Sequence, residues 1–226
     1  MKSKKSRILL LILIAALLVG ALAGLIALRV ADSRRPHSAA DFGFEEPKSP
    51  LDADGDGVDD YTDMVLGARA YIATKPVYKS AYFGGGYPTD GTGVCTDVIW
   101  NAFMAAGYSL KDLVDADIAA APEAYFKDGE RADPNIDFRR VRNLLVFFRR
   151  NATELTTSFA DPSDWAAGDI VIFDGHIAIC SDVRNARGIP YIIHHGNIVE
   201  GAVEADQMRR MPVVAHFRWP GPCGAA

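Results

Sequence analysis

The residues best suited to chemistry in this sequence are a cysteine and a group of histidines. Cys95 follows a glycine-rich stretch and opens an apolar pattern at helical spacing, with Val98, Ile99 and Ala102 on one face. At a helix N-terminus, free backbone N–H groups and the helix dipole favour a thiolate. Such a thiolate is a nucleophile, whereas a cysteine buried in a core is inert. The sequence around Cys95 is compatible with both roles.

The histidines occur at the ends of predicted strands. His176 begins one strand, and His194 and His195 end the next. Because the start of one strand lies beside the end of the next in an antiparallel pair, we expect His176 to neighbour His194 or His195. Cysteine hydrolases need a thiolate, an imidazole beside it and a polar group that orients the imidazole. These histidines could serve Cys95 in that way, while His216 on the last strand is interpreted as structural.

The elements that must position these residues follow an α+β order. Helical patterns come first and strand patterns follow, which is typical of helices packed on an antiparallel sheet. The predicted helices cover residues 63–73, 95–106, 110–120 and 137–150, and the predicted strands cover residues 170–173, 176–180, 189–195 and 213–219. Asp137 is expected to cap the last of these helices.

Three arginines of that last helix have two possible roles. Arg139, Arg140 and Arg142 could bind an anionic substrate group, or they could pair with Asp133 and Asp137. The sequence favours the structural pairing.

Composition limits the class of protein. The chain has 226 residues, 49% of them hydrophobic, which is enough for one sizeable core. A net charge of −5 without a basic region argues against nucleic acid as a partner. Cys95, Cys180 and Cys223 form neither a disulfide framework nor a zinc ligand set. We expect a monomer in which Cys180 belongs to the core.

The N-terminus predicts a signal anchor over residues 1–28. Basic residues precede an uncharged apolar run at residues 8–28, long enough to span a bilayer with the rest of the chain outside the cell. This pattern predicts a single-pass protein of the cell membrane. The alternative is a cleaved signal peptide, because Ala21 and Ala23 form an A-x-A motif, and the product would then be secreted. Residues 29–50, with proline, serine and mixed charge, are predicted to be a tether.

An acidic loop at residues 51–63 predicts a calcium site. Its carboxylates and one glycine have the spacing of an EF-hand loop, in which six to eight oxygens surround one Ca²⁺ ion. Asp63 replaces the usual final glutamate, so the loop is more similar to dockerin-like calcium loops than to sensor EF-hands. A solvated acidic linker is the alternative. The predicted ligands are Asp52, Asp54, Asp56, the carbonyl of Val58, Asp60 and Asp63.

The order of these residues resembles the NlpC-type, papain-like cysteine hydrolases of bacterial cell walls. In that family a tyrosine, a Gly-Gly loop and a proline precede the catalytic cysteine. A Gly-Asp-hydrophobic strand and a strand-opening histidine come later. The matching residues here are Tyr82, Gly84, Gly85, Pro88, Cys95, Gly168, Asp169, His176 and His194. The chain also resembles an uncharacterised bacterial branch of that superfamily, a domain of unknown function, through blocks at residues 93–98, 133–144 and 168–177.

The resemblance implies a role for each of these side chains. Cys95 would be the nucleophile and His176 the general base and then the acid. His194 would orient His176, with His195 as the alternative. Tyr82 and the backbone N–H of Cys95 would be oxyanion donors. The implied reaction is amide hydrolysis through a thioacyl-enzyme, with peptidoglycan stem peptides as the substrate class.

The resemblance also implies a papain-like domain over residues 64–220, followed by a tail at 221–226. Val94 and Thr96 flank the cysteine where cell-wall peptidases usually have Asp and Ser, and the insert before His176 is longer. The substrate therefore stays open. An acyltransferase on the same fold and a non-catalytic wall-binding module are the alternative functions.

Overall fold

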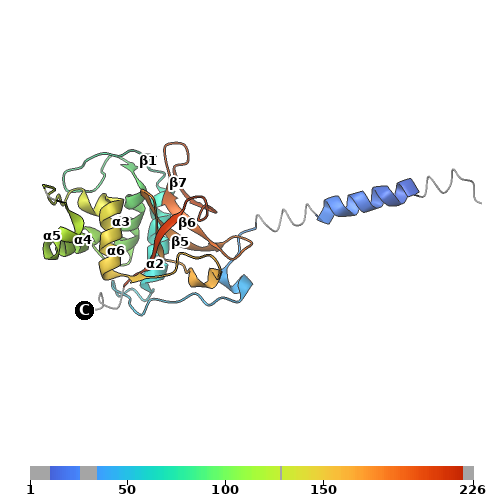
Figure 1. Ribbon diagram of the computed structural model, residues 1–226, viewed down its shortest axis with the longest axis horizontal. Helices are drawn as coiled ribbons and strands as arrows, with labels where there is room; N and C mark the ends of the chain where they lie inside the picture. Colours follow the sequence, from blue (N-terminus) through green and yellow to red (C-terminus); the bar gives the residue numbers. More distant parts are fainter. Residues whose placement is uncertain (1–10, 26–34, 128, 221–226) are drawn as a thin grey trace, which may run out of the picture.

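The computed structural model of the chain describes residues 11–25, 35–127 and 129–220 (Figure 1). Its centre is a six-stranded sheet in the order β3-β8-β4-β5-β6-β7, in which every neighbouring pair is antiparallel. The strands are β3 (Thr153–Glu154), β4 (Ile170–Phe173), β5 (His176–Arg184), β6 (Pro190–His195), β7 (Ala202–Ala205) and β8 (Val213–Arg218). Strands β1 (Val77–Tyr78) and β2 (Thr92–Gly93) form a separate parallel pair.

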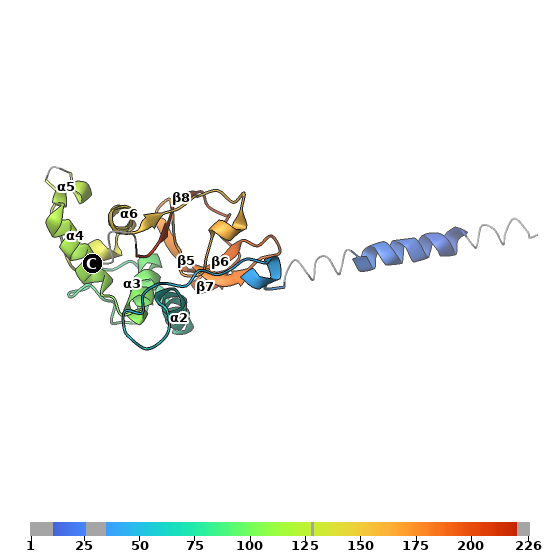
Figure 2. The same ribbon diagram turned by 90° about the horizontal axis from the view of Figure 1, so that it is seen from below.

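Helices cover one face of this sheet, and they precede most of it in the chain. They are α2 (Asp60–Ala73), α3 (Cys95–Ala105), α4 (Leu110–Ala120), α5 (Pro122–Tyr125) and α6 (Val141–Asn151). Figures 1 and 2 show α3 to α6 on one side of the molecule and β5 to β7 on the other. The predicted α+β class, with helices and an antiparallel sheet, is therefore confirmed.

The two faces of the sheet lie in separate cores, because side chains alternate along a strand. Ile177 and Ile179 of β5 pack into the larger core together with α3 and Cys95. Ala178 and Cys180 point the other way, into a smaller core. Cys180 is fully buried there, in agreement with its predicted place.

Helices α2 and α3 pack so closely that their backbones come into contact, and Gly67 of α2 allows this approach. A Cβ on Gly67 would lie 2.4 Å from the Cβ of Ala105, which is closer than two carbon atoms can approach. This crossing fixes α2 against the helix that begins with Cys95. Any larger residue at position 67 would push the two helices apart.

The helix predicted to begin at Asp137 begins later. Asp137 lies in a 3-10 turn, η2 (Asp137–Arg139), and α6 follows at Val141. Its carboxylate accepts the backbone N–H of Asp133 at 2.6 Å and the amide of Asn143 at 3.0 Å. Asp137 therefore ties the preceding turn to the helix and does not cap the first turn of α6.

Residues 35–50, part of the predicted tether, are packed on the domain and form what we call the strap. They contain a 3-10 turn, η1 (Ala39–Phe42), and a β-bridge between His37 and Arg184. The carboxylate of Glu46 accepts hydrogen bonds from the buried guanidinium of Arg184 at 2.7 Å and from the backbone N–H of Ala167 at 3.0 Å. These contacts hold the strap on the domain, so the tether prediction is wrong for residues 35–50. Residues 29–34 lie outside the described part of the chain.

The prediction of a single-pass membrane protein is contradicted. Within the described residues, no helix is both long and apolar enough to cross a membrane. Of the predicted span, residues 11–25 are described, and they are helical. The remaining parts of the predicted span, residues 8–10 and 26–28, lie outside the described residues, as does the predicted tail at 221–226.

Candidate functional site

Cys95 is the first residue of α3, as the sequence predicts, and it is largely buried, with 8% of its surface exposed. The backbone N–H groups of Ile177, Thr96 and Cys95 are near its sulfur and lower the pKa of the thiol. Ile177 is the second residue of β5 and directly follows His176. The folded chain therefore brings the thiol against the start of the strand that carries the candidate base.

Burial decides the charge of this thiol. Burial raises the pKa of Cys95 to about 11, although the N–H groups of Ile177 and Thr96 lower it in part. The expectation that the helix N-terminus would leave a thiolate is therefore wrong for this structure. The loss of hydration outweighs the helix dipole, which is worth only ~0.3–1 kcal/mol at an exposed helix end. The resting thiol of Cys95 is neutral.

His176 is hydrogen-bonded to His194, with 3.0 Å between Nε2 of His176 and Nδ1 of His194. The two rings are perpendicular, with centroids 5.1 Å apart. Burial lowers the pKa of His176 to about 4, the neighbouring His194 lowers it further, and Glu200 opposes the shift. Both rings are therefore neutral near pH 7, since burial also lowers the pKa of His194. Among the described residues, no hydrogen bond joins the His176 ring to the sulfur of Cys95.

His195 has a different environment, because adjacent residues of a strand face opposite sides. Its Nδ1 lies 2.9 Å from the hydroxyl of Tyr71 on α2, and Tyr78 packs edge-on against its ring. Burial lowers the pKa of His195, with a nearby Asp97 opposing. Of the two histidines that the sequence left open, His194 is the one in contact with His176.

A pocket of about 410 Å³ opens beside the histidine pair. His176 and His194 line it together with Glu200, Gln207 and Arg210. Nε2 of His194 is buried and has no hydrogen-bond partner among the described residues. The sequence analysis missed these pocket residues, because they come from turns whose sequence carries no motif.

Tyr82 lies where it contacts a neighbouring loop. Its side chain is 60% exposed. The hydroxyl donates to Asp133 at 3.3 Å and accepts from the amide of Asn135 at 2.9 Å. These bonds would have to break for Tyr82 to serve as an oxyanion donor, so its predicted role gains no support from the geometry and stays a prediction.

The arginines predicted to be structural do form ion pairs. Arg140 pairs with Asp137 as expected, and Arg142 pairs with Glu130. Arg139 makes a buried pair with Asp97, in the first turn of α3. Neither Glu130 nor Asp97 was a predicted partner, and Asp97 is far from Arg139 in the sequence.

His216 lies inside the domain, as its structural interpretation requires. Nε2 is 2.9 Å from Asp169, Nδ1 is 2.8 Å from the carbonyl oxygen of Thr156, and the ring stacks on Trp165 at 3.9 Å. Asp169 also accepts two hydrogen bonds from Arg218. This network ties β8 to the start of β4 and lies in the part of the sheet away from the strand ends that carry the candidate pair.

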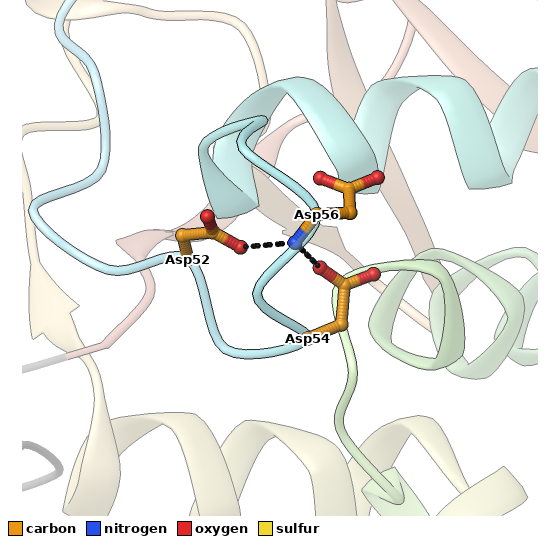
Figure 3. A group of neighbouring side chains, drawn as sticks. All are labelled: Asp52, Asp54 and Asp56. Carbon is orange, nitrogen blue, oxygen red and sulfur yellow. Dashed lines mark hydrogen bonds between the residues drawn. The ribbon is translucent and has the colours of Figure 1, made fainter.

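The acidic loop gathers part of its predicted ligand set. Oxygens of Asp52, Asp54 and Asp56 lie within 4.8 Å of one another (Figure 3). Asp60 is fully buried, and its oxygens accept from the backbone N–H of Ala53 at 2.9 Å and from Tyr108 at 2.6 Å. The geometry therefore gives no support for Asp60 as a metal ligand, because protein donors already occupy its carboxylate.

Two comparisons with known proteins found a match. Residues 65–219 match the family model described as "Domain of unknown function (DUF1287)". The chain is also similar to "Uncharacterized protein YijF" of Escherichia coli (strain K12), with 37% identity over 165 residues that cover 68% of this chain and 78% of that protein. No solved structure matches the chain.

Proposed function

The chain belongs to the DUF1287 family, and from the chemistry of its site we propose that it is a cysteine hydrolase that cleaves amide bonds. Peptidoglycan stem peptides are the proposed substrate class, because of the resemblance to NlpC-type, papain-like hydrolases. The same resemblance suggests a papain-like arrangement of the helices and the sheet.

One observation carries the proposal. The backbone N–H of Ile177, the residue next to His176, is near the sulfur of Cys95 and lowers the pKa of the thiol, and Ile177 and Cys95 both belong to the larger core. His176 is itself held by His194 at 3.0 Å. A thiol, an imidazole and a group that orients the imidazole are the three parts of a cysteine hydrolase site. In β5, His176 lies on the face of Ala178 and opposite Phe173, whereas Ile177 faces Cys95. The proposal therefore requires the His176 ring to turn around the start of β5 toward the sulfur.

The charges of the resting groups indicate which mechanism is available. With Cys95 and His176 both neutral, His176 acts as a general base during attack and does not form an ion pair beforehand. Its Nδ1 takes the thiol proton as the sulfur bonds to the carbonyl carbon, and its Nε2–H donates to His194. The protonated ring then gives the proton to the leaving amine. Water, deprotonated by the same Nδ1, hydrolyses the thioester and releases Cys95 as the thiol.

The pocket beside the histidines is the proposed place of the substrate, and because Cys95 is not among its lining residues, the bound substrate would have to extend from it to the sulfur. The pocket offers the carboxylate of Glu200, the amide of Gln207 and the exposed guanidinium of Arg210 around the rings of His176 and His194. A peptide carries both amide groups and charged ends, which suit such a mixed lining.

A non-catalytic binding module is the second candidate. The buried neutral thiol favours it, since such cysteines are usually unreactive. The two functions differ in whether bonds break, which a digestion measures directly.

The test is mass spectrometry of peptidoglycan fragments after incubation with the full chain. We expect new amine and carboxylate ends with the wild-type protein and with Cys180→Ala, and none with Cys95→Ala or His176→Ala. Both cysteine variants remove a buried thiol from a core, so Cys180→Ala is a matched control. Binding without cleavage would support the module, and transfer of the acyl group to an added amine in place of water would support an acyltransferase.

A further inference from the structure

The acidic loop before α2 is wrapped around one carboxylate. Asp52 accepts the backbone N–H groups of Gly55 at 2.8 Å, Asp56 at 3.1 Å and Gly57 at 2.9 Å. Gly57 has a φ of 94°, which a residue with a side chain rarely adopts. Carboxylate oxygens of Asp52, Asp54 and Asp56 lie within 4.8 Å of one another, and all three side chains are exposed. Figure 3 shows the oxygens of Asp52 and Asp54 that accept the backbone N–H of Asp56.

Asp63, in the first turn of α2, provides an independent observation. Only 6% of its surface is exposed, and its Oδ2 has no hydrogen-bond partner among the described residues. The carboxylates of Asp56, Asp54, Asp60 and Asp52 all raise the pKa of Asp63 by repulsion, and its oxygens lie outside the group that Asp52, Asp54 and Asp56 form within 4.8 Å. A buried carboxylate oxygen without a donor is costly, and a cation is the partner that such an environment lacks.

We propose that this loop binds one Ca²⁺ ion through Asp52, Asp54, Asp56, the backbone carbonyl of Val58 and the unpartnered carboxylate of Asp63. Ca²⁺ takes six to eight oxygens in flexible geometry, which four carboxylates and a carbonyl supply with the help of water. Mg²⁺ requires octahedral geometry and gives up its water reluctantly, so it fits this loop less well.

The site would act on the fold through Asp60. Asp60 links the loop to the turn after α3, since its carboxylate accepts hydrogen bonds from the backbone N–H of Ala53 in the loop and from the hydroxyl of Tyr108 in the turn. Gly107 of the same turn has room only for hydrogen, because a Cβ there would lie 2.9 Å from the backbone nitrogen of Asp54. Calcium at the loop would therefore stabilise the junction between α2 and α3, the helix that begins with Cys95.

Calorimetric titration and thermal unfolding of the full chain at pH 7, after treatment with EDTA, test the proposal. CaCl₂ should bind with a stoichiometry of one and, at 10 mM, should raise the unfolding midpoint by about 3–10 °C if the Kd is in the ~10⁻⁴–10⁻³ M range. The variant Asp63→Asn should show neither heat of calcium binding nor a calcium-dependent rise of the unfolding midpoint. Without calcium, the unfolding midpoint of Asp63→Asn should be equal to that of the wild type or higher. The amide has the same shape as the carboxylate, and it removes one negative charge from a cluster of carboxylates that repel one another.

The control is Asp59→Asn, which changes the charge of the same loop by the same amount. Asp59 accepts from the backbone N–H of Ser49 and from the Thr62 hydroxyl, and it is not among the proposed ligands. It should keep the calcium shift. The proposal fails if the wild type shows neither heat nor shift, if Asp63→Asn keeps both, or if MgCl₂ produces an equal shift, because charge screening alone would do that.

Discussion

Arg139 holds Asp97 through two parallel hydrogen bonds, from Nε to Oδ1 at 2.8 Å and from Nη2 to Oδ2 at 3.0 Å. The side chains are 1% and 0% exposed. The same carboxylate accepts the backbone N–H of Val94 at 2.7 Å and the indole N–H of Trp100 at 2.7 Å. This ion pair therefore fixes the first turn of α3, on which Cys95 lies.

Replacing Arg139 by methionine should destabilise the domain strongly. The Asp97 carboxylate would stay buried without its charged partner, and breaking a buried pair from one side costs about 3–5 kcal/mol. Arg142→Met is the matched control, because the pair of Arg142 with Glu130 is exposed and worth at most ~1 kcal/mol. Urea denaturation measures both. If both variants lose an equally small free energy of unfolding, the buried pair does not stabilise α3.

Alkylation of Cys95 by iodoacetamide should become faster with pH over a wide range. With a pKa of about 11, the thiolate fraction rises about tenfold per pH unit from pH 7 to 10, whereas an ordinary thiol of pKa ~8.5 levels off above pH ~9. Peptide mapping by mass spectrometry gives the rate. Cys180, fully buried and with its pKa raised well above the usual value by burial, should stay unlabelled.

The variant His176→Ala provides a separate check on the same rate. Because His176 is already neutral above its pKa of about 4, its removal should change the labelling rate little between pH 7 and 10. A rate that is high at pH 6 and collapses in His176→Ala would show instead that the two residues form an ion pair.

Stability should fall as the solution becomes more acidic, partly because of His176. Its pKa is about 4 in the folded chain and near 6.5 in the unfolded chain. Between these values the unfolded chain binds a proton that the folded chain does not, so unfolding is favoured as pH falls. The free energy of unfolding is therefore unaffected by the protonation of His176 above pH ~6.5. It falls by on the order of 3 kcal/mol as the pH decreases from ~6.5 to ~4.

Urea denaturation at pH 7 and at pH 4.5 measures this loss. His176→Gln cannot take up the proton, so its stability should depend less on pH than that of the wild type over the same range. An identical decrease in both proteins would assign the effect to other groups.

His194 and His195 should respond differently to substitution. His194→Ala removes the acceptor that orients His176 and should lower kcat on an amide substrate by about 10²-fold with little change in KM. His194→Asn offers an oxygen near the position of Nδ1 and should restore part of the rate. His195→Ala should leave kcat within a few fold, while unfolding becomes easier by about 1–3 kcal/mol because Tyr71 loses its buried partner. The reverse pattern would place the orienting role on His195.

Much of the fold follows from local patterns. The Asp-Gly pair at residues 174–175 favours a tight hairpin between the two predicted strands, and Phe173 does pair with His176 across it. Serine is a favourable N-cap residue, and Ser109, just before the predicted helix at residues 110–120, accepts a hydrogen bond from the backbone N–H of Asp112. The antiparallel pairing also predicted that His176 would neighbour His194 or His195, and His194 is the one in contact with it. These features depend on neighbours in sequence, so the sequence reveals them.

The remaining features depend on tertiary contacts. The charge of Cys95 is set by burial between α3 and β5, and a helix-terminus argument alone predicted the opposite direction. Asp60 has metal-ligand spacing, but Tyr108, far along the chain, already occupies its carboxylate. The contact of Arg139 with Asp97 likewise joins two segments that are far apart in the chain, and nothing in either segment's sequence indicates that they meet. Long-range partners decide which of several suitable side chains is free to act.

The contact between Arg184 and Glu46 sets the length of chain that can fold independently. The guanidinium of Arg184 is 1% exposed, and Glu46 of the strap supplies its only carboxylate among the described residues. A fragment cut to the family-matched stretch, residues 65–219, would leave that cation with carbonyl oxygens of Trp165, Gly188 and Pro162 and no counter-charge. It would also lose the first turn of α2. The autonomous folding unit of this chain therefore extends beyond the family match and includes the strap.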